Sequence, residues 1–170
     1  MNNYIQTVKE GLMFTKHLID KTLITLEIGD KTTLFILLEK NGNIHRKGDG
    51  GQHEKELPLM TGISRDGHFD ALMMTVDENL FQYAGVIKMP QRIGTECRMT
   101  IIFNGNDGAV DYSFRVVYGE QSQGPPIELA QILINAVKLT EPWYQQQIAE
   151  VTESTKSKWW SFWKDDPDKL

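Results

Sequence analysis

The chain has 170 residues, a net charge of −5 at pH 7 and 40% hydrophobic residues. This composition excludes a disordered chain, a collagen-like fibre and a disulfide-stapled mini-protein, and the length fits one domain. The acidic balance argues against nucleic acid as a partner, because phosphate binding requires a basic face.

The first predicted element is an amphipathic helix from Asn3 to about Ile19. Apolar residues recur there at helical spacing, and Asn2 or Asn3 can cap the first turn. The residues that form this apolar stripe are Ile5, Val8, Leu12, Thr15 and Ile19.

Two strands follow, joined by the hairpin dipeptide Gly29-Asp30. Pairing Ile28 with Lys31 and continuing along both strands places Phe35 and Leu37 on the same face as Ile24 and Leu26. The second strand is apolar on both faces, from Leu34 to Leu38, so we expect it to be central and covered on both sides. Asn41-Gly42 then predicts a turn into a third strand, Asn43–Lys47.

The middle of the chain is harder to interpret. Periodicity is absent from Gly48 to Phe69, where glycines and Pro58 punctuate a polar stretch, so we predict a long loop. Alternation of apolar and polar residues then predicts strands at Asp70–Val76 and Phe81–Met89, the second ended by Pro90.

The last predicted hairpin has a defined register. Cys97, Met99, Ile101 and Phe103 fall on one face of its first strand, and Tyr112, Phe114 and Val116 on one face of its second. A turn centred on Gly105-Asn106 pairs Ile101 with Val110 and sets Glu96 opposite Arg115, a favourable pair of opposite charges.

Two helices are expected to end the domain. Pro125-Pro126 opens the first, and Thr140 caps the second, which runs to about Thr155. The apolar stripe of the first consists of Ile127, Ala130, Leu133, Ile134 and Val137.

The predicted fold class is therefore α+β, with an N-terminal helix, an antiparallel meander of up to seven strands and two C-terminal helices packed on the sheet. We predict a single domain over residues 1–156 and a Trp-rich tail over 157–170.

The search for catalytic and metal-binding motifs gives few candidates. His45, His53, His68 and Asp70 are weak candidates for a metal site, because their spacing matches no standard motif. Cys97 is in phase with core residues and is interpreted as a core side chain. We therefore predict no catalytic residues, no metal and no cofactor.

The tryptophans are unevenly distributed: all four lie at or after position 143. The tail residues Trp159, Trp160, Phe162 and Trp163 carry a large potential burial energy. They can fold back on the sheet, dock on a partner or second copy, or lie at a membrane interface. The acidic residues that follow weaken the membrane alternative.

The leading hypothesis is a non-enzymatic cytoplasmic protein-interaction module, comparable in class to chaperone-like or inhibitor-like proteins. Met1, Asn2 and Asn3 give no positive start for a secretion signal, and no apolar run is long enough to span a bilayer. A single cysteine also favours a reducing compartment. A homodimer is compatible with this hypothesis.

The alternative is a small-ligand or metal-binding enzyme with its site in loop 45–70, where Arg46 would contact an anion.

Overall fold

The computed structural model describes residues 16–77, 80, 83–105 and 111–164, and for 155–164 it describes only the backbone. In chain order the elements are η1 (Lys16–Leu18), β1 (Ile19–Ile28), β2 (Lys31–Glu39), β3 (Asn43–Gly48), β4 (Leu59–Ile63), α2 (His68–Thr75), β5 (Gly85–Lys88), β6 (Glu96–Gly105), β7 (Asp111–Gly119) and α3 (Ile127–Lys164).

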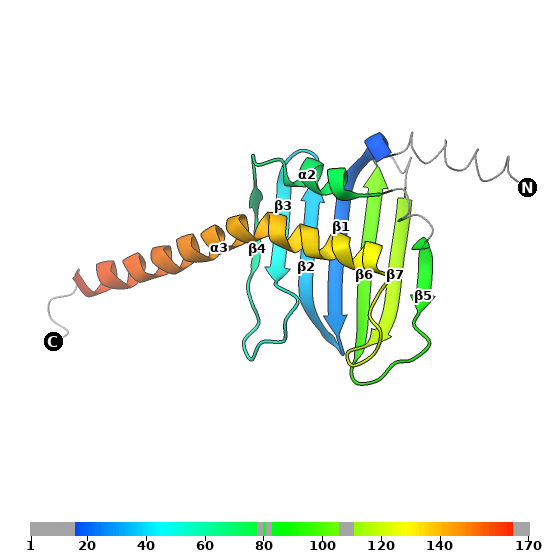
Figure 1. The fold of residues 1–170 in the computed structure, drawn as a ribbon. Helices are drawn as coiled ribbons and strands as arrows, with labels where there is room; N and C mark the ends of the chain where they lie inside the picture. Colours follow the sequence, from blue (N-terminus) through cyan, green and yellow to red (C-terminus); the bar gives the residue numbers. More distant parts are fainter. Residues whose placement is uncertain (1–15, 78–79, 81–82, 106–110, 165–170) are drawn as a thin grey trace, which may run out of the picture.

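The strands form one seven-stranded sheet in the order β4-β3-β2-β1-β6-β7-β5. Neighbouring strands are antiparallel except β5, which pairs parallel to β7. Figure 1 shows α2 and α3 on the same face of the sheet, with α3 crossing the strands and continuing past the β4 edge. No described element lies on the opposite face.

The core lies between this face and the two helices. Alternate residues of β1, β2 and β6 supply its floor, among them Ile24, Ile36 and Ile101, each fully buried. Leu72 of α2 and Leu129 of α3 cover these strand residues on the helix side of the core. One buried layer therefore holds the described elements together.

The first hairpin begins as predicted, with Ile28 opposite Lys31, but its register shifts by one residue between Leu26 and Glu27. Thr33 is the extra residue of this β-bulge, and its hydroxyl donates to the carbonyl of Leu26 at 3.2 Å. Beyond the bulge Leu26 faces Leu34. A one-residue slip turns every later side chain to the other face of the strand.

The predicted faces of β2 are therefore reversed. Leu34, Ile36 and Leu38 enter the core, whereas Phe35 and Leu37 lie on the opposite face and are only half-buried. The expectation that β2 is covered on both sides is wrong for the part of the chain that the structure describes. Its interior position in the sheet is confirmed.

Glycines in the following segment accommodate the bulge. Gly50 N–H donates to the carbonyl of Thr33 at 3.1 Å. Gly48, with φ +75°, lies so close that a Cβ there would come within 2.0 Å of the same carbonyl oxygen. Only glycine combines this conformation with this approach.

The β6–β7 hairpin has the predicted faces but not the predicted register. Ile101 lies opposite Phe114 and Glu96 opposite Gly119, a shift of four residues from the expected pairing. Residues 106–110, including Val110, fall outside the described part. Glu96 instead accepts from Arg98 at 2.9 Å, and the rings of Phe103 and Phe114 meet edge to face at 6.0 Å.

The segment predicted as strand Asp70–Val76 is mostly helix α2. Phe69, Leu72, Met73 and Val76 are buried at helical spacing, whereas Met74 is 86% exposed. The alternation of apolar residues in this segment also satisfied the helical pattern. In the predicted loop Gly48–Phe69, residues Leu59–Ile63 form β4.

The expected strand Phe81–Met89 begins at residues 81–82, which lie outside the described part, and within its described residues only Gly85–Lys88 form a strand, β5. Its parallel pairing with β7 contradicts the antiparallel meander. The strand does stop just before Pro90, as predicted.

The two predicted C-terminal helices are one continuous helix, α3, with Pro142 inside it. Pro142 cannot donate an amide hydrogen bond, which normally breaks a helix. The carbonyl that loses its helical donor is that of Lys138, four residues before Pro142. In the same turn the Thr140 hydroxyl donates to the carbonyl of Ala136 at 2.7 Å, and Arg46 donates to that of Val137 at 3.2 Å, two carbonyls that Pro142 does not affect. Thr140 is therefore an internal helix residue and not a cap.

The predicted stripe of this helix is right only in part, because Leu133 and Val137 pack against the core, whereas Ile127 is 77% exposed and Ile134 is 41% exposed. The buried face is formed by Leu129, Ile132, Ala136, Thr140, Trp143 and Tyr144.

The predicted N-terminal helix Asn3–Ile19 lies mostly outside the described residues. Its predicted end is wrong, because Lys16–Leu18 form a 3-10 turn and Ile19 begins β1. The predicted architecture, an N-terminal helix, an antiparallel meander and two C-terminal helices, is therefore wrong. The described residues form a mixed seven-stranded sheet, a short helix α2 and a long helix α3. These elements remain compatible with the α+β class.

We predict that Gly48→Ala destabilises the fold several times more than Gly67→Ala. Both glycines have positive φ, a strain of about 1 kcal/mol for alanine, but a Cβ at Gly67 meets nothing within 4 Å. Urea unfolding of both variants measures the difference. Equal losses of unfolding free energy would contradict the role given to the Thr33 bulge.

Candidate functional site

The face of the sheet opposite α2 and α3, which we call the open face, has an apolar centre. Leu23, Leu37 and Ile102 lie side by side in one row across β2, β1 and β6, and Phe35 lies in the next row, beside Thr25 and Thr100. All six side chains are half-buried although no described element covers them. A solvated sheet face normally carries polar side chains, so this apolar centre requires an explanation.

Charged pairs border the apolar centre at both ends of the strands. At one end Lys21 contacts Glu39 at 2.8 Å, and at the other Arg98 contacts Glu27 at 3.2 Å. Hydrogen bonds from Lys21 and then Asn43 hold the pKa of the Glu39 carboxyl below its usual value. Glu39 therefore stays ionised at neutral pH, and the open face combines an apolar centre with a charged rim.

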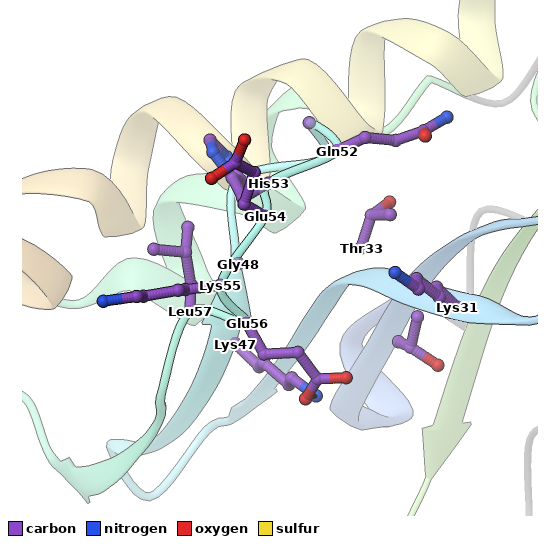
Figure 2. Close-up of a pocket in the computed structure, with 12 residues that line it drawn as sticks. Lys31, Thr33, Lys47, Gly48, Gln52, His53, Glu54, Lys55, Glu56 and Leu57 are labelled. Carbon is purple, nitrogen blue, oxygen red and sulfur yellow. Dashed lines mark hydrogen bonds and ion pairs between the residues drawn. The ribbon is translucent and has the colours of Figure 1, made fainter.

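A pocket of about 300 Å³ lies between β2 and the loop that follows β3 (Figure 2). Lys31 and Thr33 come from β2, and the loop side chains lie across from them. The lining has charges of both signs, and Lys47 pairs with Glu56 at 2.7 Å. The pocket is therefore not built for one strongly charged ligand.

His53 is the histidine of this pocket. Its Nε2 lies 2.8 Å and 3.0 Å from the two carboxylate oxygens of Asp49. Burial raises the pKa of Asp49, but hydrogen bonds from Gly51 N–H and His53 outweigh it and keep the pKa low. The lining contains no serine or cysteine, the hydroxyl of Thr33 is bonded to the carbonyl of Leu26, and the hydrogen bonds of the His53 ring go to Asp49 and not to a nucleophile.

The other metal candidates lie elsewhere. His45 belongs to β3 and faces the open face, His68 is the first residue of α2, and Asp70 is exposed on α2. Among the described residues, no three His, Cys, Asp or Glu side chains are grouped so that they could hold a metal ion. The structure therefore does not bring His45, His53, His68 and Asp70 together.

His68 has an unusual environment. Its Nε2 is buried without a hydrogen-bond partner, and the nearest carboxylate oxygen, of Asp66, is 3.7 Å away. Burial lowers the pKa of the His68 imidazole, which Asp66 offsets only in part. His68 is therefore neutral in the folded protein at pH 7.

Cys97 is buried at 3% exposure, as predicted for a core side chain. Burial raises the pKa of its thiol, and the nearby Glu120 and Glu96 add to this. A thiol with a raised pKa is a poor nucleophile.

Arg46 is fully buried and holds α3 to β3, which is not the anion contact expected from sequence. Its guanidinium donates to the Thr140 hydroxyl at 3.0 Å, pairs with Glu141 and lies 4.7 Å from the ring centroid of Tyr144. Tyr144 in turn donates to the carbonyl of Pro58 at 2.6 Å, just before β4. These contacts fix where α3 crosses the edge of the sheet.

Beyond this point α3 leaves the sheet. Residues 149–164, which we call the overhang, continue as helix past β4 (Figure 1), and the side chains of 149–154 are exposed. The backbone of Trp159, Trp160, Phe162 and Trp163 belongs to the overhang, but their side chains are outside the described part of the chain.

Comparison with known proteins gives no relative: no family model, no curated protein and no solved structure matches the chain. None of the described helices is long and apolar enough to cross a membrane. The candidate site therefore has to be judged on its own geometry.

Sequence reasoning missed the open face because the Thr33 bulge was not visible in the pattern. One signal was present, since the uninterrupted run Leu34–Leu38 provides more apolar side chains than one buried face can use.

Arg46→Met should lower the free energy of unfolding by about 3 kcal/mol, because buried acceptors on α3 and β3 lose their donor. Arg92→Met removes an exposed pair with Glu96 and should cost under about 1 kcal/mol. Urea unfolding compares the two variants. Similar losses would mean that Arg46 does not anchor α3.

The pKa of His68 predicts a pH dependence of stability. The folded pKa is below the unfolded value of about 6.5, so the unfolded state binds more protons as the pH falls. The contribution of neutral His68 is present above that value and is lost on acidification towards the folded pKa. We expect the melting temperature of wild type to fall from pH 7.5 to 5.5 more steeply than that of His68→Gln. Parallel curves would contradict this.

Proposed function

We propose that this protein is a non-enzymatic protein-interaction module that binds its partner on the open face of the sheet. The observation that carries the proposal is the apolar centre formed by Leu23, Phe35, Leu37 and Ile102, which no described element covers. Burying these side chains against a partner would remove apolar surface from water, the main favourable term in association.

The chemistry of the face favours a protein over a small molecule. A protein interface typically has an apolar centre and a polar rim, as this face does, whereas small ligands occupy concave sites that enclose most of their surface. The salt bridges of Lys21 and Arg98 lie where a rim would add specificity. A chaperone-like or inhibitor-like role is compatible with such a surface.

The proposal includes the overhang as a second contact. Aromatic side chains are enriched among the residues that dominate binding energy, and the overhang carries Trp159, Trp160, Phe162 and Trp163 in sequence. A cytoplasmic location is also part of the proposal, supported by the single cysteine.

The test compares two charge substitutions. Leu37→Asp places a charge in the apolar centre, and Ile127→Asp places one on an exposed position of α3 that is 77% exposed. Tagged full-length proteins would be used to capture partners from extracts of the native source. We expect the partners of wild type to bind Ile127→Asp and to be lost from Leu37→Asp.

Identical partners for both variants would contradict the proposal. A melting temperature for Leu37→Asp far below that of Ile127→Asp would also contradict it, because that result would mean that the chain itself covers the open face.

A further inference from the structure

The two edges of the sheet are protected to different degrees. The β5 edge is short, begins at Gly85 with φ +108°, ends at Lys88 and is followed by Pro90. Charges, prolines and short length are the devices by which edge strands avoid pairing with other chains. β4 is also short, with five residues, but its span Leu59–Ile63 contains no charged residue and no proline.

The side chains and backbone of β4 are presented for pairing. Leu59 is 54% exposed and Ile63 is 72% exposed. Ile63 lies opposite Asn43, and in the next pair of the same ladder Ser64 N–H donates to the carbonyl of Gly42. Since hydrogen-bonded pairs alternate along an antiparallel ladder, the amide and carbonyl groups of Leu59, Thr61 and Ile63 point away from β3. Only another extended chain matches this row of donors and acceptors.

Helix α3 covers the space beside this edge. A Cβ on Gly62 would lie 3.2 Å from the Trp143 ring, so α3 crosses β4 at this point. Adjacent strands are about 4.8 Å apart and a helix rises about 1.5 Å per residue, so one further strand corresponds to about three further helical residues. The same Cβ would lie 3.9 Å from Oε1 of Gln147, so β4 lies beneath the turn from Trp143 to Gln147, and three residues further along the helix is position 150. Val151, which follows Gln147 by one helical turn and is 53% exposed, is therefore the apolar side chain nearest to an added strand.

We infer that β4 accepts an extended segment of a partner polypeptide as an additional strand beneath the start of the overhang. The segment carries apolar side chains towards Met60 and Val151, and it is not acidic, because the carboxylate of Glu150 is exposed beside Val151. Main-chain hydrogen bonds supply affinity in this mode, and alternate side chains supply specificity. The inference adds a binding mode to the proposed function, but it rests on β4 and not on the apolar centre of the open face.

The test uses peptides, because the natural partner is not identified. Random 12-residue peptides displayed on phage would be selected on the full-length protein, and binding of the selected peptides would be measured by fluorescence polarisation. Thr61→Pro removes only an outward N–H, and Thr61→Val is the matched control that keeps it. We expect Thr61→Pro to weaken binding by about tenfold or more and Thr61→Val to preserve it.

A second pair of variants keeps the test decisive if Thr61→Pro does not fold. Val151→Asp places a charge above the added strand, whereas Ile134→Asp charges an exposed position elsewhere on α3. We expect only Val151→Asp to weaken peptide binding, and we expect the amides of Leu59, Thr61 and Ile63 to exchange more slowly with solvent in the complex. Leu37→Asp should bind these peptides normally, which separates this inference from the proposed function.

The inference would be overturned by selection of no peptide, or by peptides that bind Thr61→Pro or Val151→Asp as tightly as wild type. The inference would also be overturned if the same amides exchanged slowly in the free protein and light scattering showed a dimer. That result would mean that a second copy of the chain occupies the edge.

Discussion

One extra residue, Thr33, decides which side chains of β2 enter the core. Its carbonyl is approached so closely by Gly48 that no other residue fits there, and its hydroxyl bonds back to Leu26. The bulge therefore couples β2 to both neighbours in the sheet. Without it, Phe35 and Leu37 would face the helices and the opposite face would receive Leu34, Ile36 and Leu38. Core composition and candidate binding surface are thus two results of the same local geometry.

Local signals in the sequence predicted local structure well. The turns at Gly29-Asp30 and Asn41-Gly42, the shared faces of β6 and β7, and the stop before Pro90 are all present. The failures come from tertiary contacts. The bulge depends on Gly48, which is distant in sequence, and the turn of α3 just before Pro142 is held to β3 by Arg46, a residue of another element. Asp70–Val76 failed for a different reason, because its apolar residues fit both periods.

The candidate site was less predictable than the fold. Histidines at 45, 53 and 68 are close in sequence, yet β3, the loop and α2 direct them to different places. The apolar centre of the open face combines β1, β2 and β6, so no single segment shows it. The β4 edge lay inside a stretch without periodicity, where a five-residue strand gives too little pattern to detect. The tryptophan cluster was visible from sequence, but only the helix reveals that its backbone extends beyond the sheet.

The single cysteine has a practical consequence. Because Cys97 is buried and its pKa is raised, it offers little thiolate to an alkylating reagent under mild conditions. A cysteine introduced at an exposed position would thus react selectively without removal of the native one. A fluorophore on Ile63→Cys would report on the β4 edge, and one on Val151→Cys would report on the start of the overhang. The protein is therefore well suited to spectroscopic mapping of two surfaces, one label at a time.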